Sequence, residues 1–216
     1  MPSPLAALSP LDGRYASTAD PLRSHFSEQA LIRYRVKIEL AWLQALAGER
    51  GIRELKPFSR RTSAEFARLL KGFSERDAGE IKRIEAETNH DVKAIEYWLK
   101  AKLARNREAQ RSLEFVHFAC TSEDINNLAY ALMVKDSREQ VMLPRLDELV
   151  AALKQLARRH AALPMLSRTH GQAATPTTLG KEMANFAHRL QRARGRIAAA
   201  GVLGKLNGAV GNYNAH

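Results

Sequence analysis

The chain has 216 residues, of which 34 are Lys or Arg and 23 are Asp or Glu, giving a formal net charge of +11 and a pI of about 10.1. Its 45% hydrophobic and 26% charged residues are typical of a globular protein and exclude a disordered one. No run approaches the ~18 apolar residues that a bilayer span needs, and the first residues do not resemble a secretory signal. The single cysteine, Cys120, excludes an internal disulfide and, by itself, a cysteine-based zinc site. These features predict a cytoplasmic protein.

The positive charge is concentrated in the last quarter of the chain. Residues 164–216 contain seven Lys or Arg and one acidic residue, Glu182. Such an excess indicates either an anionic partner or a surface that acidic sequence from elsewhere completes. The aromatic content of 6%, with no basic stripe interleaved with aromatic residues, argues against nucleic acid as that partner.

Helical periodicity dominates the first half of the chain. The segment before Ser27 contains four prolines and a glycine, so we expect it to be irregular. Apolar spacings of three and four then predict five helices. In chain order these are 27–47 with Ser27 as N-cap, 62–72, a third from the Ser74 and Asp77 capping box to about Thr88, a fourth capped by Asp91, and a fifth over about 108–118.

The second half predicts two longer helices. Ser122 with its two following acidic residues provides an N-cap for a helix to about Leu163, interrupted at Pro144. Residues 164–175 break the pattern and include a short extended stretch. Thr175 and Pro176 read as N-cap and first residue of a helix to about 200, and 204–216 form a loop.

Long helices joined by a compact loop are typical of a helical bundle, since each helix must bury an apolar stripe. The sequence therefore predicts an all-α fold. The leucines between residues 128 and 156 need apolar packing partners, and the 216 residues do not obviously provide them. We therefore expect that oligomerisation or a continuation of the sequence provides these partners.

Catalytic and binding residues are most readily expected in four polar clusters at breaks between helices. The chain contains no glycine-rich phosphate loop, paired-cysteine metal motif or Gly-x-Ser-x-Gly elbow. The clusters are Asp12–Tyr15, Thr88–Asp91, Thr121–Asp124 and Ser167–Gln172.

Two of the clusters predict anion contacts. Arg14 and Tyr15 could bind an anion through the guanidinium and phenol groups; the alternative is a turn with an exposed arginine. Thr121 and Ser122 offer two hydroxyls and a helix N-terminus to a carboxylate or phosphate; the alternative is capping alone.

The other two clusters contain histidines. Asn89, His90 and Asp91 lie at a helix start, where free N–H groups favour an anion; alternatively Asp91 merely caps the helix. His170, in a helix-free segment, could transfer a proton near neutral pH, or it could be a hydrogen-bonded structural residue.

Other histidines and the cysteine are interpreted structurally. His25, His117, His160 and His188 lie within or beside predicted helices and are expected to be surface or satisfied core residues. Cys120 is expected to pack as a small apolar residue.

Taken together and in order, these blocks resemble the adenylosuccinate lyase family of the fumarase/aspartase superfamily, in its bacterial branch. The resemblance spans nearly the whole chain. It is carried by SPLDGRY (9–15), FSE (26–28), TNHDVKAIEY (88–97), EFVHFACTSEDINNLAYALM (114–133), LSRTHGQAATPTTLGKEMAN (166–185) and GKLNGAVGNYNAH (204–216).

The resemblance implies a β-elimination that releases fumarate from adenylosuccinate, giving AMP, and from the succinyl-carboxamide ribotide of purine synthesis. It implies that His170 is the general acid. The implied substrate-binding residues are Arg14, Tyr15, Asn89, His90, Asp91, Thr121 and Ser122. It also implies no metal or organic cofactor, purine nucleotides and fumarate as ligands, no membrane partner, and a homotetramer with shared active sites.

One family feature has no match in these 216 residues. Family members carry a mobile loop of the form Gly-Ser-Ser-x-Met-Pro-x-Lys-x-Asn-Pro whose serine is taken as the catalytic base. We therefore interpret the chain as an N-terminal portion and expect it to be inactive alone. The corresponding division is an N-terminal helical domain over 1–110 and a partial central bundle over 111–216.

The sequence also allows two alternative functions. A sister lyase of the superfamily, acting on argininosuccinate or fumarate, would share the bundle but fits DGRY and TNHDVKAIEY less well. A non-catalytic helical interaction module could instead bind polyanions through 164–216.

Overall fold

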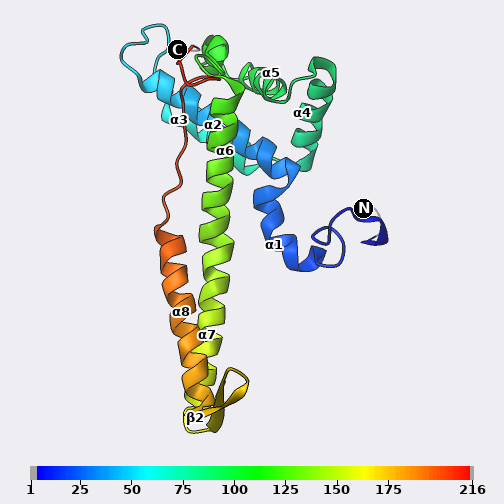
Figure 1. The fold of residues 1–216 in the computed structure, drawn as a ribbon. Coiled ribbons are helices and arrows are strands. Elements are labelled where there is room, and N and C mark those ends of the chain that lie inside the picture. The colour runs from blue at the N-terminus through cyan, green and yellow to red at the C-terminus, as the bar shows by residue number, and fades with distance from the viewer. Residues whose placement is uncertain (1–3, 215–216) are drawn as a thin grey trace. The chain divides into compact units, whose positions relative to one another are not determined.

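The structure, a computed structural model, describes residues 4–214 (Figure 1). Pro2 of the first segment, and Ala215 and His216 of the last sequence block, lie outside the described residues. The chain divides into two compact units, residues 1–134 with 203–216, and residues 135–202. The boundary expected between residues 110 and 111 concerns domains of a longer bundle and stays a prediction.

Helices form nearly all of the regular structure, which confirms the predicted helical fold. The first unit contains η1 (Pro4–Ala6), α1 (Ala16–Phe26), α2 (Glu28–Gly48), α3 (Arg60–Lys71), α4 (Glu75–Thr88), α5 (Asp91–Leu103), η2 (Ala109–Phe115) and the start of α6 (Ser122–Ser137). The second contains the end of α6, the π-helical segment η3 (Arg138–Met142), α7 (Leu143–Arg159), the strands β1 (Pro164–Thr169) and β2 (Gln172–Thr178), and α8 (Leu179–Ala199).

The core of the first unit lies where α2, α4 and α5 pack together. Leu40 and Leu43 of α2, Ile81 of α4, and Ile95 and Leu99 of α5 are almost completely buried in one cluster. Each such side chain contributes about 1.5–3 kcal/mol through removal of apolar surface from water. This core fixes the helix ends that carry the polar clusters.

Local capping signals were accurate for two helices. The Ser27 side chain accepts a hydrogen bond from the Ala30 N–H at the start of α2. At the start of α4, Ser74 and Asp77 form the predicted capping box. Both signals depend on residues three positions apart, so the local sequence suffices to specify them.

Two expectations in the first unit are wrong. The segment before Ser27 is not irregular throughout, because α1 forms there with Pro21 inside it and with His25 buried 3.3 Å from the Tyr34 hydroxyl. Packing against α2 thus outweighs the unfavourable proline. Residues 109–115 form a 3₁₀-helix in place of the predicted α-helix, and the left-handed backbone at His117 (φ 63°) ends the helical run.

In the second unit, α7 and α8 lie side by side and are joined by a β-hairpin (Figure 1). Gly180 permits their close approach, because a Cβ there would lie 2.6 Å from the Ala161 Cα. The break predicted at Pro144 is confirmed: η3 precedes it, and the proline occupies the first turn of α7.

The predicted helix start at Thr175 and Pro176 is wrong. Both residues belong to β2, which pairs antiparallel with β1, and Pro176 stands opposite Leu166. α8 begins three residues later, where the Thr178 hydroxyl accepts the Lys181 N–H at 3.1 Å. Pairing between strands therefore overrides the local N-cap signal. None of the helices in the described part of the chain combines the length and apolar content of a transmembrane span.

Candidate active site

The start of α5 brings three of the sequence-predicted residues together. Asn89 ends α4 in the left-handed conformation (φ 52°, ψ 35°), and His90 and Asp91 follow at once. Asn is one of the few residues that adopt this conformation readily. The turn aims all three residues at one surface cavity of about 500 Å³, whose lining also includes Lys82 and Glu85 of α4.

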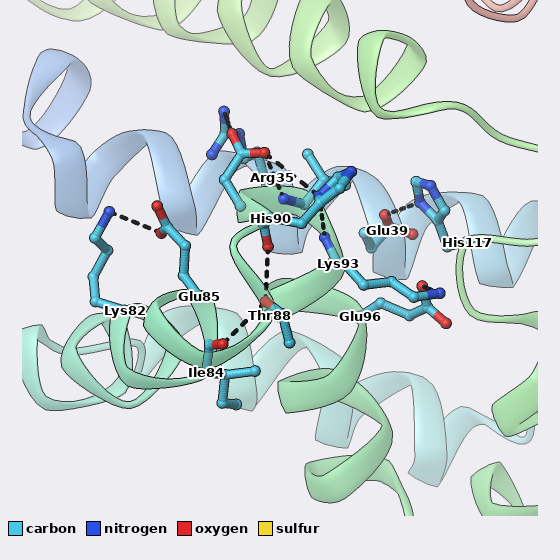
Figure 2. A network of polar contacts seen from close by, with 12 residues as sticks. Arg35, Glu39, Lys82, Ile84, Glu85, Thr88, His90, Lys93, Glu96 and His117 are labelled. Atoms are coloured by element: carbon cyan, nitrogen blue, oxygen red, sulfur yellow. Dashed lines mark hydrogen bonds and ion pairs between the residues drawn. The ribbon is translucent and has the colours of Figure 1, made fainter.

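His90, not Asp91, is the N-cap of α5. Its Nδ1 accepts the Lys93 N–H at 3.2 Å (Figure 2). A nitrogen that accepts a hydrogen bond carries no proton, so the capping bond leaves the ring N–H on Nε2. The half-exposed His90 ring therefore presents an N–H donor to a ligand.

Asp91 is held by two donors. Its Oδ1 accepts the Val92 N–H at 2.8 Å, and its Oδ2 lies 2.7 Å from Nη2 of Arg35 in α2. Burial opposes ionisation of this carboxyl, but the Val92 N–H and the Arg35 guanidinium outweigh burial and hold the pKa of Asp91 below its ordinary value. The cavity at the start of α5 is thus lined by a fixed carboxylate.

The start of α6 carries Thr121 and Ser122. α6 begins at Ser122, and the Asp124 carboxylate accepts the Thr121 N–H at 3.0 Å, so Thr121 occupies the cap position where Ser122 was expected. Thr121 and Ser122 thus stand at the N-terminus of α6, next to its first N–H groups.

Asp124 ties this helix start to the end of the described chain. The carboxylate is fully buried and accepts hydrogen bonds from the N–H groups of Asn207 (3.1 Å) and Gly208 (3.2 Å) and from Lys205 Nζ (3.1 Å). Burial raises the pKa of Asp124, but these donors together lower it below its ordinary value. The predicted loop after Gly204 is thereby fastened to α6.

Arg14 and Tyr15 lie just before α1, and both are exposed. The Arg14 guanidinium stacks on the Tyr15 ring, 5.5 Å from its centroid. This contact orients the guanidinium and leaves its N–H groups available for an anion.

His170 lies in the second unit, at the tip of the β1–β2 hairpin. His170 and Gly171 both have positive φ (49° and 76°), as a type I′ turn between antiparallel strands requires. The imidazole is exposed. The described contacts within the first unit therefore form three groups, at Arg14 and Tyr15, at the start of α5 and at the start of α6, while His170 belongs to the other unit.

Three residues of these sites were missed by sequence reasoning: Arg35, Asp124 as an anchor, and Lys205. Arg35 is one of several charged residues of α2, and Lys205 lies about 80 residues after its partner, so no local pattern connects either pair. The Ser-Glu-Asp run at residues 122–124 was the one available signal, and it indicated only a helix start.

His117 and Cys120 have structural surroundings, and His188 is exposed. The buried Glu39 carboxylate lies 2.6 Å from His117 Nδ1 (Figure 2). Burial raises the pKa of the Cys120 thiol to about 12, so it stays protonated at neutral pH. Among the described residues, no group of three His, Cys, Asp or Glu side chains is arranged to hold a metal ion.

Comparison with solved structures supports a shared fold. A fumarate lyase from Mesorhizobium sp. BNC1 matches with a TM-score of 0.70 and 25% identity, over 91% of this chain and 44% of that one. A β-carboxy-cis,cis-muconate cycloisomerase from Acinetobacter calcoaceticus matches with a TM-score of 0.71 and 23% identity, over 94% and 46%. The second likeness concerns the fold alone.

Comparison with sequences is more specific. The chain is 52% identical to the adenylosuccinate lyase of Haemophilus influenzae and 51% identical to that of Escherichia coli K12, in each case over 99% of this chain and 47% of the relative. It thus spans about half the length of these curated relatives. A family model described as Lyase matches residues 13–216. The chain therefore belongs to this lyase family.

Proposed function

We propose that the chain forms the N-terminal part of an adenylosuccinate lyase. The enzyme would convert adenylosuccinate into AMP and fumarate, and the succinyl-carboxamide ribotide of purine synthesis into its carboxamide and fumarate. The observation that carries this proposal is the identity of about 50% with adenylosuccinate lyases along 99% of the chain. Purine nucleotides and fumarate as ligands, a homotetramer, a cytoplasmic location and the absence of a cofactor belong to the same proposal.

The reaction requires two proton transfers. A base removes a proton from the carbon next to a carboxylate, the C–N bond breaks with its electron pair on nitrogen, and an acid protonates that nitrogen. We assign the acid role to His170. Its exposure on a two-residue turn supports this role, because such a turn holds a histidine rigidly at a tip that substrate can reach.

The substrate carries phosphate and carboxylate groups, and three groups of residues suit them. Arg14 with Tyr15 supplies a guanidinium and a phenol. The starts of α5 and α6, with Asn89, His90 and Asp91 and with Thr121 and Ser122, supply hydroxyls, N–H donors and helix dipoles. Asp91 differs from the others because an ionised carboxylate accepts hydrogen bonds, so it would contact an N–H or O–H group of the nucleotide.

The test is fumarate release from adenylosuccinate by the purified chain, alone and after mixing with the separately expressed C-terminal half of the Escherichia coli relative. We expect no release by the chain alone, since no serine-loop motif occurs in its 216 residues, and release on mixing. Fumarate release by the chain alone would contradict the assignment of the base to that loop. Two folded halves that neither release fumarate nor bind AMP would contradict the proposed function.

The acid role of His170 has its own test in the active mixture. His170→Ala should lower turnover by a factor of about 100 to 10,000 while substrate still binds, because proton transfer to the leaving nitrogen is lost. His188→Ala, which changes another exposed histidine of the second unit, is the matched control and should leave turnover unchanged. Equal turnover in both variants would remove His170 from this role.

A further inference from the structure

We propose that Arg35 is a positioning residue for the nucleotide site at the start of α5. Its buried guanidinium holds the Asp91 carboxylate in place at the cavity, where Asp91 accepts a hydrogen bond from an N–H or O–H group of the nucleotide. This inference rests on the proposed function and adds to it a residue that does not itself line the cavity.

The first argument is the placement of Arg35 within the unit. The residue lies on α2, next to the core residue Val36, and its side chain is only 6% exposed. Its Nε has no hydrogen-bond partner among the described residues, and its Nη2 forms the ion pair with Asp91. An apolar side chain would pack here without the cost of burying a charge. The arginine is therefore explained by its effect on Asp91 and not by packing.

The second argument is the geometry of Asp91. Arg35 holds one carboxylate oxygen and the Val92 N–H holds the other, so the carboxylate cannot turn away from the cavity. Each carboxylate oxygen can accept two hydrogen bonds, and each has one from the protein. The side chain is 42% exposed, which leaves the second acceptor direction open to a ligand.

The third argument is the distribution of charge around Asp91. Lys82 and Glu85 of α4 line the same cavity, but they pair with each other at 2.8 Å. His90 lies 3.8 Å from the Asp91 carboxylate, and its Nδ1 is occupied by the capping bond. The cation that balances Asp91 is thus Arg35 of α2.

The first experiment needs no ligand. The carboxyl pKa of Asp91 is measured by NMR titration of the 216-residue chain as wild type, Arg35→Met and Arg35→Lys. We expect Arg35→Met to raise this pKa, because it removes the paired charge, and Arg35→Lys to raise it less, because the charge remains. An unchanged Asp91 pKa in a folded Arg35→Met variant would overturn the inference.

The second experiment measures AMP binding to the same variants by calorimetry. We expect Arg35→Met to weaken binding about 10- to 100-fold, the usual effect of losing control over one charged hydrogen bond, with Arg35→Lys in between. The matched control is Arg194→Met, which breaks the ion pair of Arg194 with Asp147 in the second unit and should leave AMP affinity unchanged.

The two proposals fail in different ways. If the wild-type chain binds AMP and Arg35→Met binds it equally well, the inference is wrong and the proposed function stands. If the folded wild-type chain binds no AMP even after mixing with the C-terminal half, the proposed function is contradicted together with the ligand contact of Asp91.

Discussion

At the starts of α5 and α6 an aspartate pairs with a basic residue, but the buried partner of the pair differs. At α5 the cation is buried and the carboxylate of Asp91 is partly exposed, whereas at α6 the carboxylate of Asp124 is fully buried and Lys205 is partly exposed. The Asp91 carboxylate lines a cavity, whereas the Asp124 carboxylate accepts hydrogen bonds from backbone N–H groups in two segments of the chain. The difference teaches that the carboxylate at a helix start can face a cavity or fasten a chain segment, and that its exposure distinguishes the two.

The largest effect should follow from Asp124→Ala. The substitution leaves Lys205 without its buried partner and three N–H groups without an acceptor, so we expect a loss of about 3–5 kcal/mol in the free energy of unfolding, measured with urea. Asp147→Ala, which breaks the exposed ion pair with Arg194, is the control and should cost at most about 1 kcal/mol. Equal losses would show that Asp124 is not an anchor.

A smaller effect should appear in acid. The pKa values of Asp91 and Asp124 are lower in the folded chain than the ordinary value of 3.8, so their stabilisation is present above that pH and is lost as the pH falls through the folded values. Asp124→Asn should therefore flatten the loss of stability below about pH 4 more than Asp91→Asn does, because the folded chain directs four donors at the Asp124 carboxylate and two at that of Asp91. Acid titration followed by circular dichroism measures both slopes. A steeper change with Asp91→Asn would reverse the comparison drawn above.

The smallest effect on stability should come from His90. His90→Ala removes the N-cap of α5 and should cost about 1 kcal/mol, whereas His90→Asn keeps a capping acceptor and should retain most of that stability. Both variants lose the Nε2–H donor, so both should weaken AMP binding. Thermal unfolding with AMP titration separates the two roles. Full affinity in His90→Asn would mean that the ring serves only as a cap.

Local sequence predicted those elements whose signals lie within one helical turn. Ser27 and the pair Ser74 and Asp77 are examples, because a cap needs only a side chain and an N–H three residues away. The hairpin at residues 164–178 was not predicted beyond a short extended stretch. Its strands exist through pairing across the turn at His170 and Gly171, and that pairing displaced the helix start from Thr175 to Thr178.

The residues of the candidate site also differ in whether local sequence predicts them. The residues at chain breaks could be selected from their chemistry and from their resemblance to a family, since each cluster is contiguous. The residues that hold these clusters in place could not be selected from the sequence, because Arg35 and Asp91 are 56 positions apart and Asp124 and Lys205 are 81 apart. Only tertiary packing brings such pairs together.

The bonds between Asp124 and residues 205–208 also affect synthesis of the chain. The first unit is discontinuous in sequence, because residues 135–202 form the second unit between its two parts. During translation, Asp124 leaves the ribosome before its partners exist. At a synthesis rate of about 5–20 residues per second, those partners follow roughly 4–17 s later. Until then the start of α6 lacks its anchor, so the first unit completes its folding only after the second has been made.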